Sequence, residues 1–173
     1  MRFSPAAIAL ATTLSLVSSI GFAQSTYMPN EGSVTLLEKG QTAQDAGDYD
    51  AAYNFFESAL VADPRNAMAY VAMAQIADVQ DLPGKAIQLY SKALELDPNN
   101  SYVLSGQGRS YVRKGAVTRA EVNLANLRLT CTSPCEPATL LEQSIAAGPP
   151  EKVITAEAVT PELTVEDAAP DAN

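Results

Sequence analysis

Two cysteines are the only residues of this sequence whose type and spacing suggest covalent chemistry. Cys131 and Cys135 are separated by Thr-Ser-Pro. In an exported protein, an even number of cysteines indicates a disulfide, and so short a loop would contribute about 2 kcal/mol of stability. Two alternatives stay open, a pair of free thiols in a reducing compartment and a thiol-exchange site. The exchange site is the poorer match, because the redox motif is Cys-x-x-Cys in a βαβ setting.

The overall composition argues against most other chemistry. The chain has 173 residues, of which 20 are acidic, 11 are basic and none is histidine, for a formal charge of −9. Without histidine, the usual serine and cysteine triads lack their base, and two cysteines cannot supply the four ligands of a zinc site. An acidic chain is also a poor match for nucleic acid. We therefore expect no catalytic residue, no metal and no cofactor, and we expect the carboxylates to act mostly as helix caps.

The first 23 residues are typical of an export signal. Arg2 precedes an uncharged stretch from Ala6 to Ile20, and Gly21-Phe22-Ala23 has the small-x-small pattern of a cleavage site. Cleavage before Gln24 would place the mature protein in the bacterial periplasm or outside the cell. The alternatives are an uncleaved anchor or a buried helix, although five Ser and Thr residues make the stretch a poor membrane span.

A period of 34 residues runs through the centre of the chain. Asp63-Pro64-Arg65-Asn66 recurs as Asp97-Pro98-Asn99-Asn100, and residues 33–66 align with 67–100 without gaps. A third frame, 101–134, keeps the register but loses the closing Asp-Pro. Such a period, made of two helical halves, is typical of stacked helical hairpins.

Small residues fall where the two helices of each hairpin would cross. In the first frame Gly40 and Ala52 occupy these positions, and Phe56 fills the space beside them. Gly47 separates the two halves and can end the first helix. The positions of Gly40, Ala52 and Phe56 are occupied by Ala74, Ala86 and Tyr90 in the second frame, and by Gly108, Ala120 and Leu124 in the third.

These residues resemble the motif of the tetratricopeptide repeat (TPR) family. The motif positions present are Gly40, Ala52, Phe56, Ala59 and Pro64, then Tyr70, Ala74, Ala86, Tyr90, Ala93 and Pro98, then Leu104, Gly108, Tyr111, Ala120 and Leu124. The resemblance covers residues 33–134. It implies an all-α fold, a right-handed superhelical solenoid of three helix-turn-helix repeats at 33–66, 67–100 and 101–134, of which the third is degenerate.

The segments on either side of the repeats differ in character. Residues 24–32 are expected to form a linker. Glu136 and Pro137 indicate a helix start, and an apolar stripe follows, so residues 136–147 are predicted to form a helix that caps the stack. Residues 148–173 contain four prolines and six acidic residues against one lysine, which predicts a disordered acidic tail.

The resemblance also points to a binding site, because the first helix of each TPR lines a concave groove. Arg109 and Arg113 are four residues apart, so they share a helix face beside Tyr102 and could hold a carboxylate or an acidic peptide. The alternative is a solvated, charged helix face. The predicted groove residues are Gln75, Asp78, Tyr102, Ser105, Arg109 and Arg113.

The expected function is that of a non-catalytic adaptor in the cell envelope. Its partner would be a peptide or acidic segment of another envelope or secreted protein, without nucleic acid and without stable membrane insertion after signal cleavage. Similar small exported TPR proteins serve in the assembly of pili, secretion systems or cell-wall complexes. The groove that grips cytosolic heat-shock chaperones is not matched at Leu37, Gln41, Gln75, Ser105 and Arg109. Two alternatives remain, a thiol-redox protein using Cys131 and Cys135 and a structural protein that self-associates through an uncovered end.

Overall fold

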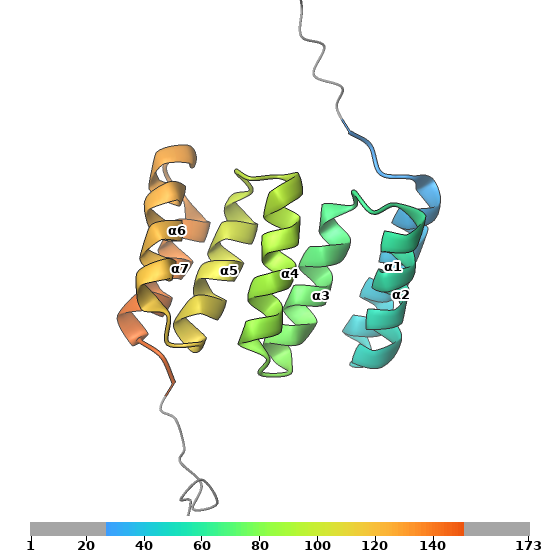
Figure 1. Cartoon of the computed structure of the whole chain (residues 1–173), viewed down its shortest axis with the longest axis horizontal. Coiled ribbons are helices and arrows are strands. Elements are labelled where there is room, and N and C mark those ends of the chain that lie inside the picture. Colours follow the sequence, from blue (N-terminus) through green and yellow to red (C-terminus); the bar gives the residue numbers. More distant parts are fainter. Residues whose placement is uncertain (1–26, 151–173) are drawn as a thin grey trace, which may run out of the picture.

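The computed structural model describes residues 27–150, which form seven helices and no strand (Figure 1). This confirms the all-helical class expected from the sequence. The predicted export signal, and the predicted acidic tail from residue 151 onward, lie outside the described residues. Within 27–150, no helix combines the length and the apolar character needed to cross a membrane. The helices are α1 (Glu31–Asp45), α2 (Tyr49–Ala62), α3 (Ala67–Val79), α4 (Pro83–Leu96), α5 (Ser101–Arg113), α6 (Val117–Thr130) and α7 (Glu136–Ala147).

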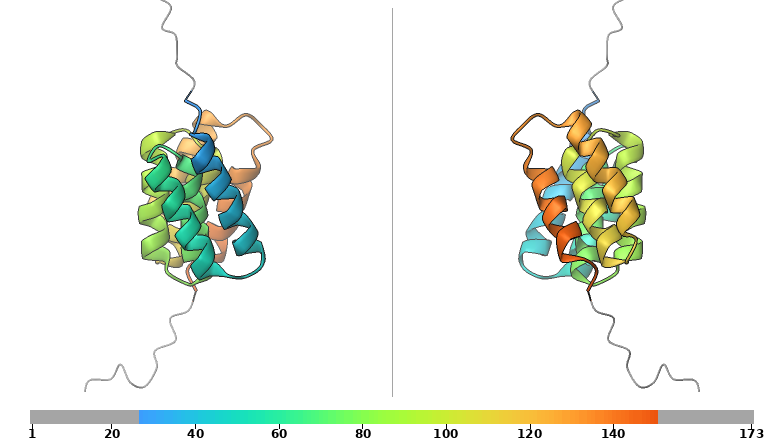
Figure 2. Two further views of the ribbon diagram at one scale, coloured as in Figure 1. Left: turned by 90° about the vertical axis from the view of Figure 1, so that its right-hand side faces the viewer. Right: turned by 90° about the vertical axis from the view of Figure 1, so that its left-hand side faces the viewer.

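The helices form a curved stack of hairpins. α1 packs on α2, α3 on α4 and α5 on α6, and α7 then packs on both α5 and α6 (Figure 1). In the end views of Figure 2, α1 and α7 project on one side of the stack and α4 lies on the other. We call the side formed by α1, α3, α5 and α7 the inner face, and the side formed by α2, α4 and α6 the outer face.

Local sequence sets the helix boundaries. The side chains of Asn30, Asp48 and Asn100 accept hydrogen bonds from backbone N–H groups in the first turns of α1, α2 and α5. Such caps satisfy donors that the helix itself leaves unpaired. Gly47 and Gly115 have φ angles of 79° and 82°, which lets the chain reverse tightly between the two helices of a hairpin.

Close helix contacts depend on small residues at the crossing points. A Cβ atom on Gly40 would collide with the aromatic ring of Phe56, so only glycine lets α1 approach α2 at this point. A Cβ atom on Gly108 would collide with the side chain of Leu141 of α7, and not with the second helix of its own hairpin. The alanines with no exposed surface are Ala52, Ala59, Ala69, Ala74, Ala86, Ala93 and Ala120.

Buried amides join the second hairpin to the third. Asn123 donates to the Leu104 carbonyl and to the Gln107 side-chain oxygen, both at 3.0 Å. Gln107 in turn donates to the Ser91 hydroxyl at 2.8 Å. Within the described residues every buried side-chain nitrogen and oxygen has a partner. This chain of bonds therefore fixes α4, α5 and α6 without leaving a polar group unsatisfied.

The segment before α1 is held against the loop between α2 and α3. The Tyr27 hydroxyl donates to Asp63 at 2.6 Å, and the Asn30 N–H donates to the same carboxylate oxygen at 2.9 Å. The Arg65 guanidinium lies 4.4 Å from the centre of the Tyr27 ring. Desolvation, with the hydrogen bond to Asp63 and its negative charge, raises the pKa of Tyr27 to about 12. The hydroxyl therefore stays protonated and keeps this contact at neutral pH.

A glycine-to-alanine pair tests the packing at the first crossing. We expect Gly40→Ala to lower the free energy of unfolding by about 1–3 kcal/mol, because the added methyl group overpacks the Phe56 ring. The matched control is Gly84→Ala, whose Cβ would lie 3.8 Å from the Lys114 ammonium nitrogen and meet no other atom within 4 Å. The control variant should show no loss in the free energy of unfolding. Urea unfolding followed by circular dichroism measures both, and equal stability of the two variants would contradict this account.

Candidate functional site

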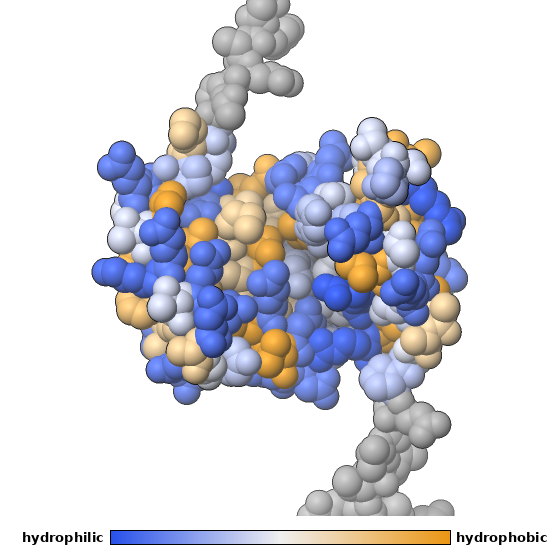
Figure 3. Space-filling model, turned by 180° about the vertical axis from the view of Figure 1, so that it is seen from behind, coloured by the Kyte–Doolittle hydropathy of each residue, from blue (hydrophilic) through white to orange (hydrophobic). Residues whose placement is uncertain are grey.

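The inner face has a groove between α1 and α3. It has a volume of about 290 Å³. Figure 3 shows this face, where apolar side chains lie in a central hollow between more hydrophilic ridges. Met68 is 51% exposed here, whereas Val71 below it is nearly buried, so the groove offers an apolar floor with one prominent side chain. Its lining residues are Gln41, Gln44, Asp45, Met68, Val71, Ala72 and Gln75.

Three glutamines give the groove its polar character. The side chains of Gln41, Gln44 and Gln75 line it and make no hydrogen bond to any residue in 27–150. Each amide carries two donors and one acceptor, which is the set needed to pair with the backbone of an extended peptide. The groove can therefore bind both the apolar side chains and the main chain of such a ligand.

The inner face continues along α5 with two exposed side chains. Tyr102 is 67% exposed. Arg109 is also exposed, and it makes no hydrogen bond or ion pair within the described part of the chain. These two residues and Gln75 are the predicted groove residues that the structure leaves accessible to a ligand.

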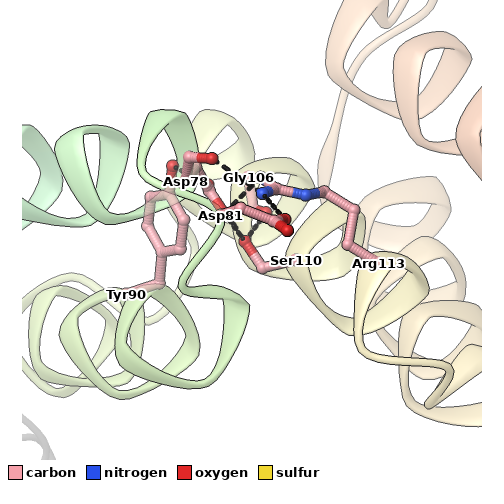
Figure 4. A network of polar contacts seen from close by, with 6 residues as sticks. All are labelled: Asp78, Asp81, Tyr90, Gly106, Ser110 and Arg113. Carbon is pink, nitrogen blue, oxygen red and sulfur yellow. Dashed lines mark hydrogen bonds and ion pairs between the residues drawn. The ribbon is translucent and has the colours of Figure 1, made fainter. Parts of the chain in front are cut away.

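The other predicted groove residues are engaged within the protein, and Asp78 is the centre of their contacts (Figure 4). One carboxylate oxygen of Asp78 accepts from the Ser110 hydroxyl at 2.8 Å and from Arg113 at 3.0 Å. The second oxygen accepts from the Tyr90 hydroxyl at 3.2 Å. Burial, together with the Asp78 charge, raises the pKa of Tyr90 above its ordinary value, so this donor stays protonated.

Arg113 ties α5 to the end of α3. Besides Asp78, it donates to the backbone carbonyl of Asp78 at 2.7 Å and to the Asp81 carboxylate at 2.8 Å. A cation at this point complements the carbonyls that a helix leaves unpaired at its C-terminus. The guanidinium thus has three partners in the second hairpin. Of the two arginines predicted to hold a ligand carboxylate, Arg113 is therefore already paired with two aspartates, whereas Arg109 makes no ion pair within the described residues.

Ser105 is also removed from the groove. It is only 3% exposed, and its hydroxyl donates to the Pro137 carbonyl at 2.8 Å. α7 covers this part of α5, in the place that the first helix of a further repeat would take. Ser105 therefore attaches α7 to the third hairpin and is not accessible to a ligand.

The two cysteines lie where α6 ends and α7 begins. The structure joins Cys131 and Cys135 in a disulfide, with a Cα–Cα distance of 5.9 Å. The bond closes the loop that leads into α7. Within 27–150, no group of three or more cysteine, aspartate or glutamate side chains is placed to hold a metal ion.

Sequence reasoning missed the pairing of Asp78 with Arg113, although a signal was present. Asp78 is the twelfth residue of its frame and Arg113 the thirteenth of the next, so they carry opposite charges at adjacent positions of successive repeats. Stacked repeats bring such positions together. Reading the frames for charge, as well as for small residues, would have indicated this contact.

Comparison with known proteins identifies the repeats. Residues 37–101 match a family model described as a tetratricopeptide repeat. A comparison with curated proteins gave no match. Among solved structures, the chain is similar to the first TPR of Spaghetti (RPAP3) bound to the HSP90 peptide SRMEEVD. The sequences are 18% identical, the TM-score is 0.62, and the match covers 69% of this chain and 98% of that one.

Two bacterial proteins have a similar fold. One is the Yersinia enterocolitica type III secretion chaperone SycD in complex with a peptide of the translocator YopD, at 19% identity and a TM-score of 0.60, covering 66% of this chain and 89% of that chain. The other is PcrH from Pseudomonas aeruginosa, at 18% identity and a TM-score of 0.60, covering 70% and 94%. Together with the family match, these similarities establish a TPR-type fold.

The two arginines of α5 should differ in their effect on stability. We expect Arg113→Gln to lower the free energy of unfolding by about 1.5–3 kcal/mol, because it breaks charged hydrogen bonds and leaves Asp78 without its cation. Arg109→Gln, one helical turn away, should change it by less than about 0.5 kcal/mol. Urea unfolding of both variants measures the difference. A similar loss in the two would show that Arg113 does not couple the hairpins.

Removing the disulfide should loosen α7. The double variant Cys131→Ser/Cys135→Ser is expected to be about 2 kcal/mol less stable, the chain-entropy value for so short a loop. Amide hydrogen exchange should become faster in α7 than in α3, since the bond acts on the loop that enters α7. Uniform acceleration over all helices would argue against this local role.

Proposed function

We propose that this chain, whose residues 37–101 match a tetratricopeptide repeat model, is a non-catalytic adaptor that binds an extended segment of another protein on its inner face. The observation that carries this proposal is the groove between α1 and α3, where a half-exposed Met68 stands among glutamines that have no partner within the described residues. An exposed apolar side chain gains free energy when a ligand covers it, at about 25 cal/mol per Å² buried. The groove is thus suited to an apolar anchor.

The glutamines favour an extended ligand. Main-chain groups of a peptide in this conformation are free to pair with side-chain amides, which gives affinity without selecting a sequence. Selectivity would then come from the apolar anchor and from charge. Asp45 lies at the α1 side of the groove, and Arg109 lies on α5. This polarity favours a segment with a basic group near Asp45 and an acidic group near Arg109.

The structural relatives support the peptide-binding part of the proposal. The Spaghetti domain holds an HSP90 peptide, and SycD holds a peptide of YopD. The ligand of the present chain would differ from the acidic HSP90 segment. Arg113 is already neutralised by two aspartates and Ser105 is buried, so a cluster of ligand carboxylates would meet only Arg109.

We place this adaptor in the bacterial cell envelope, on the basis of the export signal predicted at residues 1–23. The partner would then be another envelope or secreted protein, in the assembly of pili, secretion systems or cell-wall complexes. The Cys131–Cys135 disulfide is consistent with an oxidising compartment.

Selection from a random peptide library tests the groove and does not require the partner to be identified. Peptides selected on the full chain should share an apolar residue, and their affinity should fall at least tenfold on the Met68→Glu and Gln75→Glu variants. Met68→Glu removes the apolar surface that the apolar residue of the peptide would cover. Gln75→Glu replaces a side-chain amide by a carboxylate, which repels the carbonyl oxygens of the peptide. Fluorescence anisotropy with labelled peptides measures the affinities.

The matched control is Val61→Glu. Val61 is an apolar residue of α2, 86% exposed and absent from the groove lining, so the same substitution should leave peptide affinity unchanged. Circular dichroism melting confirms that each variant is folded. Peptides that bind equally well to the Met68→Glu variant would move the site away from the inner face and contradict the proposal.

A further inference from the structure

The outer face has a second and larger groove. It has a volume of about 610 Å³ and lies among α2, α4 and α6, with one side chain, Tyr111, from α5. Two half-buried apolar residues of α4, Ile87 and Leu89, contribute to its lining. A hollow of about 280 Å³ adjoins it and shares Tyr53 and Lys85. Since α2, α4 and α6 form the opposite side of the stack from the inner groove, the two grooves can be occupied independently (Figure 2).

Cations stacked on tyrosines mark this outer groove. The Lys85 ammonium lies 4.1 Å from the centre of the Tyr53 ring, and the Arg119 guanidinium lies 5.7 Å from that of Tyr111. Neither forms an ion pair with a carboxylate in the described part of the chain, whereas Lys92 beside them is bound to Glu95 at 2.9 Å. A cation above a ring still presents N–H donors to an incoming carboxylate.

The repeat itself aligns the two cations. Lys85 and Arg119 are 34 residues apart, so each is the nineteenth residue of its frame. Stacked repeats place equivalent residues in a row along one face. The outer groove therefore presents two positive charges one repeat apart, on α4 and α6, together with the apolar side chains of α4.

The chain contains a segment with the complementary pattern. Residues 151–173 include six carboxylates and one lysine, and these alternate with apolar residues. The apolar members are Val153, Ile154, Val159, Leu163 and Val165. We propose that the outer groove binds this acidic segment of the same chain, with carboxylates on Lys85 and Arg119 and apolar side chains on Ile87 and Leu89.

Length and tethering permit this contact. Twenty-three residues reach up to about 75 Å when extended, whereas a helix of 14 residues spans only about 21 Å. The segment begins just after α7, at one end of the stack (Figure 1). A tethered segment has an effective concentration in the millimolar range, so a millimolar dissociation constant is sufficient for occupancy. Exposed ion pairs contribute little each, so the apolar contacts to Ile87 and Leu89 have to add to them. The inner groove stays open to a partner protein.

The experiment compares the full chain with a full chain whose acidic segment is neutralised. The variant carries Glu157→Gln, Glu162→Gln, Glu166→Gln and Asp167→Asn, and the measurement is the set of backbone amide resonances in ¹⁵N-labelled protein. We expect neutralisation to shift resonances of residues 85–92 and 111–119. A synthetic peptide of residues 151–173, added to the neutralised chain, should reverse these shifts in a saturable way. Its binding should weaken as added salt shortens the Debye length from about 10 Å at 0.1 M to about 3 Å at 1 M.

Charge reversal on the two faces identifies the site. In the neutralised chain, Lys85→Glu/Arg119→Glu should lower the affinity for the peptide at least tenfold. Lys39→Glu/Arg109→Glu makes the same change of charge on α1 and α5, and it should leave the affinity within about twofold. Circular dichroism melting checks that both variants are folded, and the peptide shifts themselves show which residues are contacted.

Three results would overturn the proposal. Unchanged resonances at residues 85–92 and 111–119 after neutralisation would show that the segment does not occupy the outer groove. Loss of peptide binding only in the Lys39→Glu/Arg109→Glu variant would place the segment against α1 or α5. Shifts that grow with protein concentration would assign the groove to the segment of a second copy of the chain.

Discussion

The whole structure depends on the close approach of antiparallel helices at small residues. A hairpin alone leaves one side of each helix exposed, and only stacking on the next hairpin covers it. Gly40 and Ala52 let α1 and α2 approach, and Phe56 then fills the remaining space with no exposed surface. Contacts of α2 with α3 and of α4 with α5 then join these hairpins into a curved stack (Figure 1). The inner and outer faces, with their grooves, result from that curvature.

Polar contacts then decide which residues are left for binding. Arg109 and Arg113 are on one face of α5 and one turn apart, yet only Arg113 reaches Asp78 and Asp81 at the end of α3. Ser105 is similarly used to attach α7. In α5, the first helix of the third hairpin, Tyr102 and Arg109 therefore face solvent, whereas Arg113 connects the second hairpin to the third.

The sequence was a good guide to the fold and a partial guide to the site. The 34-residue period and the helix-spaced small residues are local properties, so the all-helical repeat fold could be predicted and is confirmed. The side chain that fills the space beside Gly108 could not be predicted. Leu141 belongs to a different helix, α7, and periodicity alone does not indicate which helix packs there. The engagement of Arg113 likewise depends on how successive hairpins are placed. The export signal and the remaining groove residues stay predictions.

The regular spacing has a consequence for how such a protein can change in evolution. Lys85 and Arg119 recur at one position of the frame, and so do Gln41 and Gln75 of the inner groove. Duplication of one 34-residue unit within the gene would therefore lengthen both grooves together, by the same increment. The insertion would have to precede α7, since Leu141 and the disulfide fit this helix to the third hairpin. The lengths of the two grooves are thus coupled genetically, although the grooves lie on opposite faces.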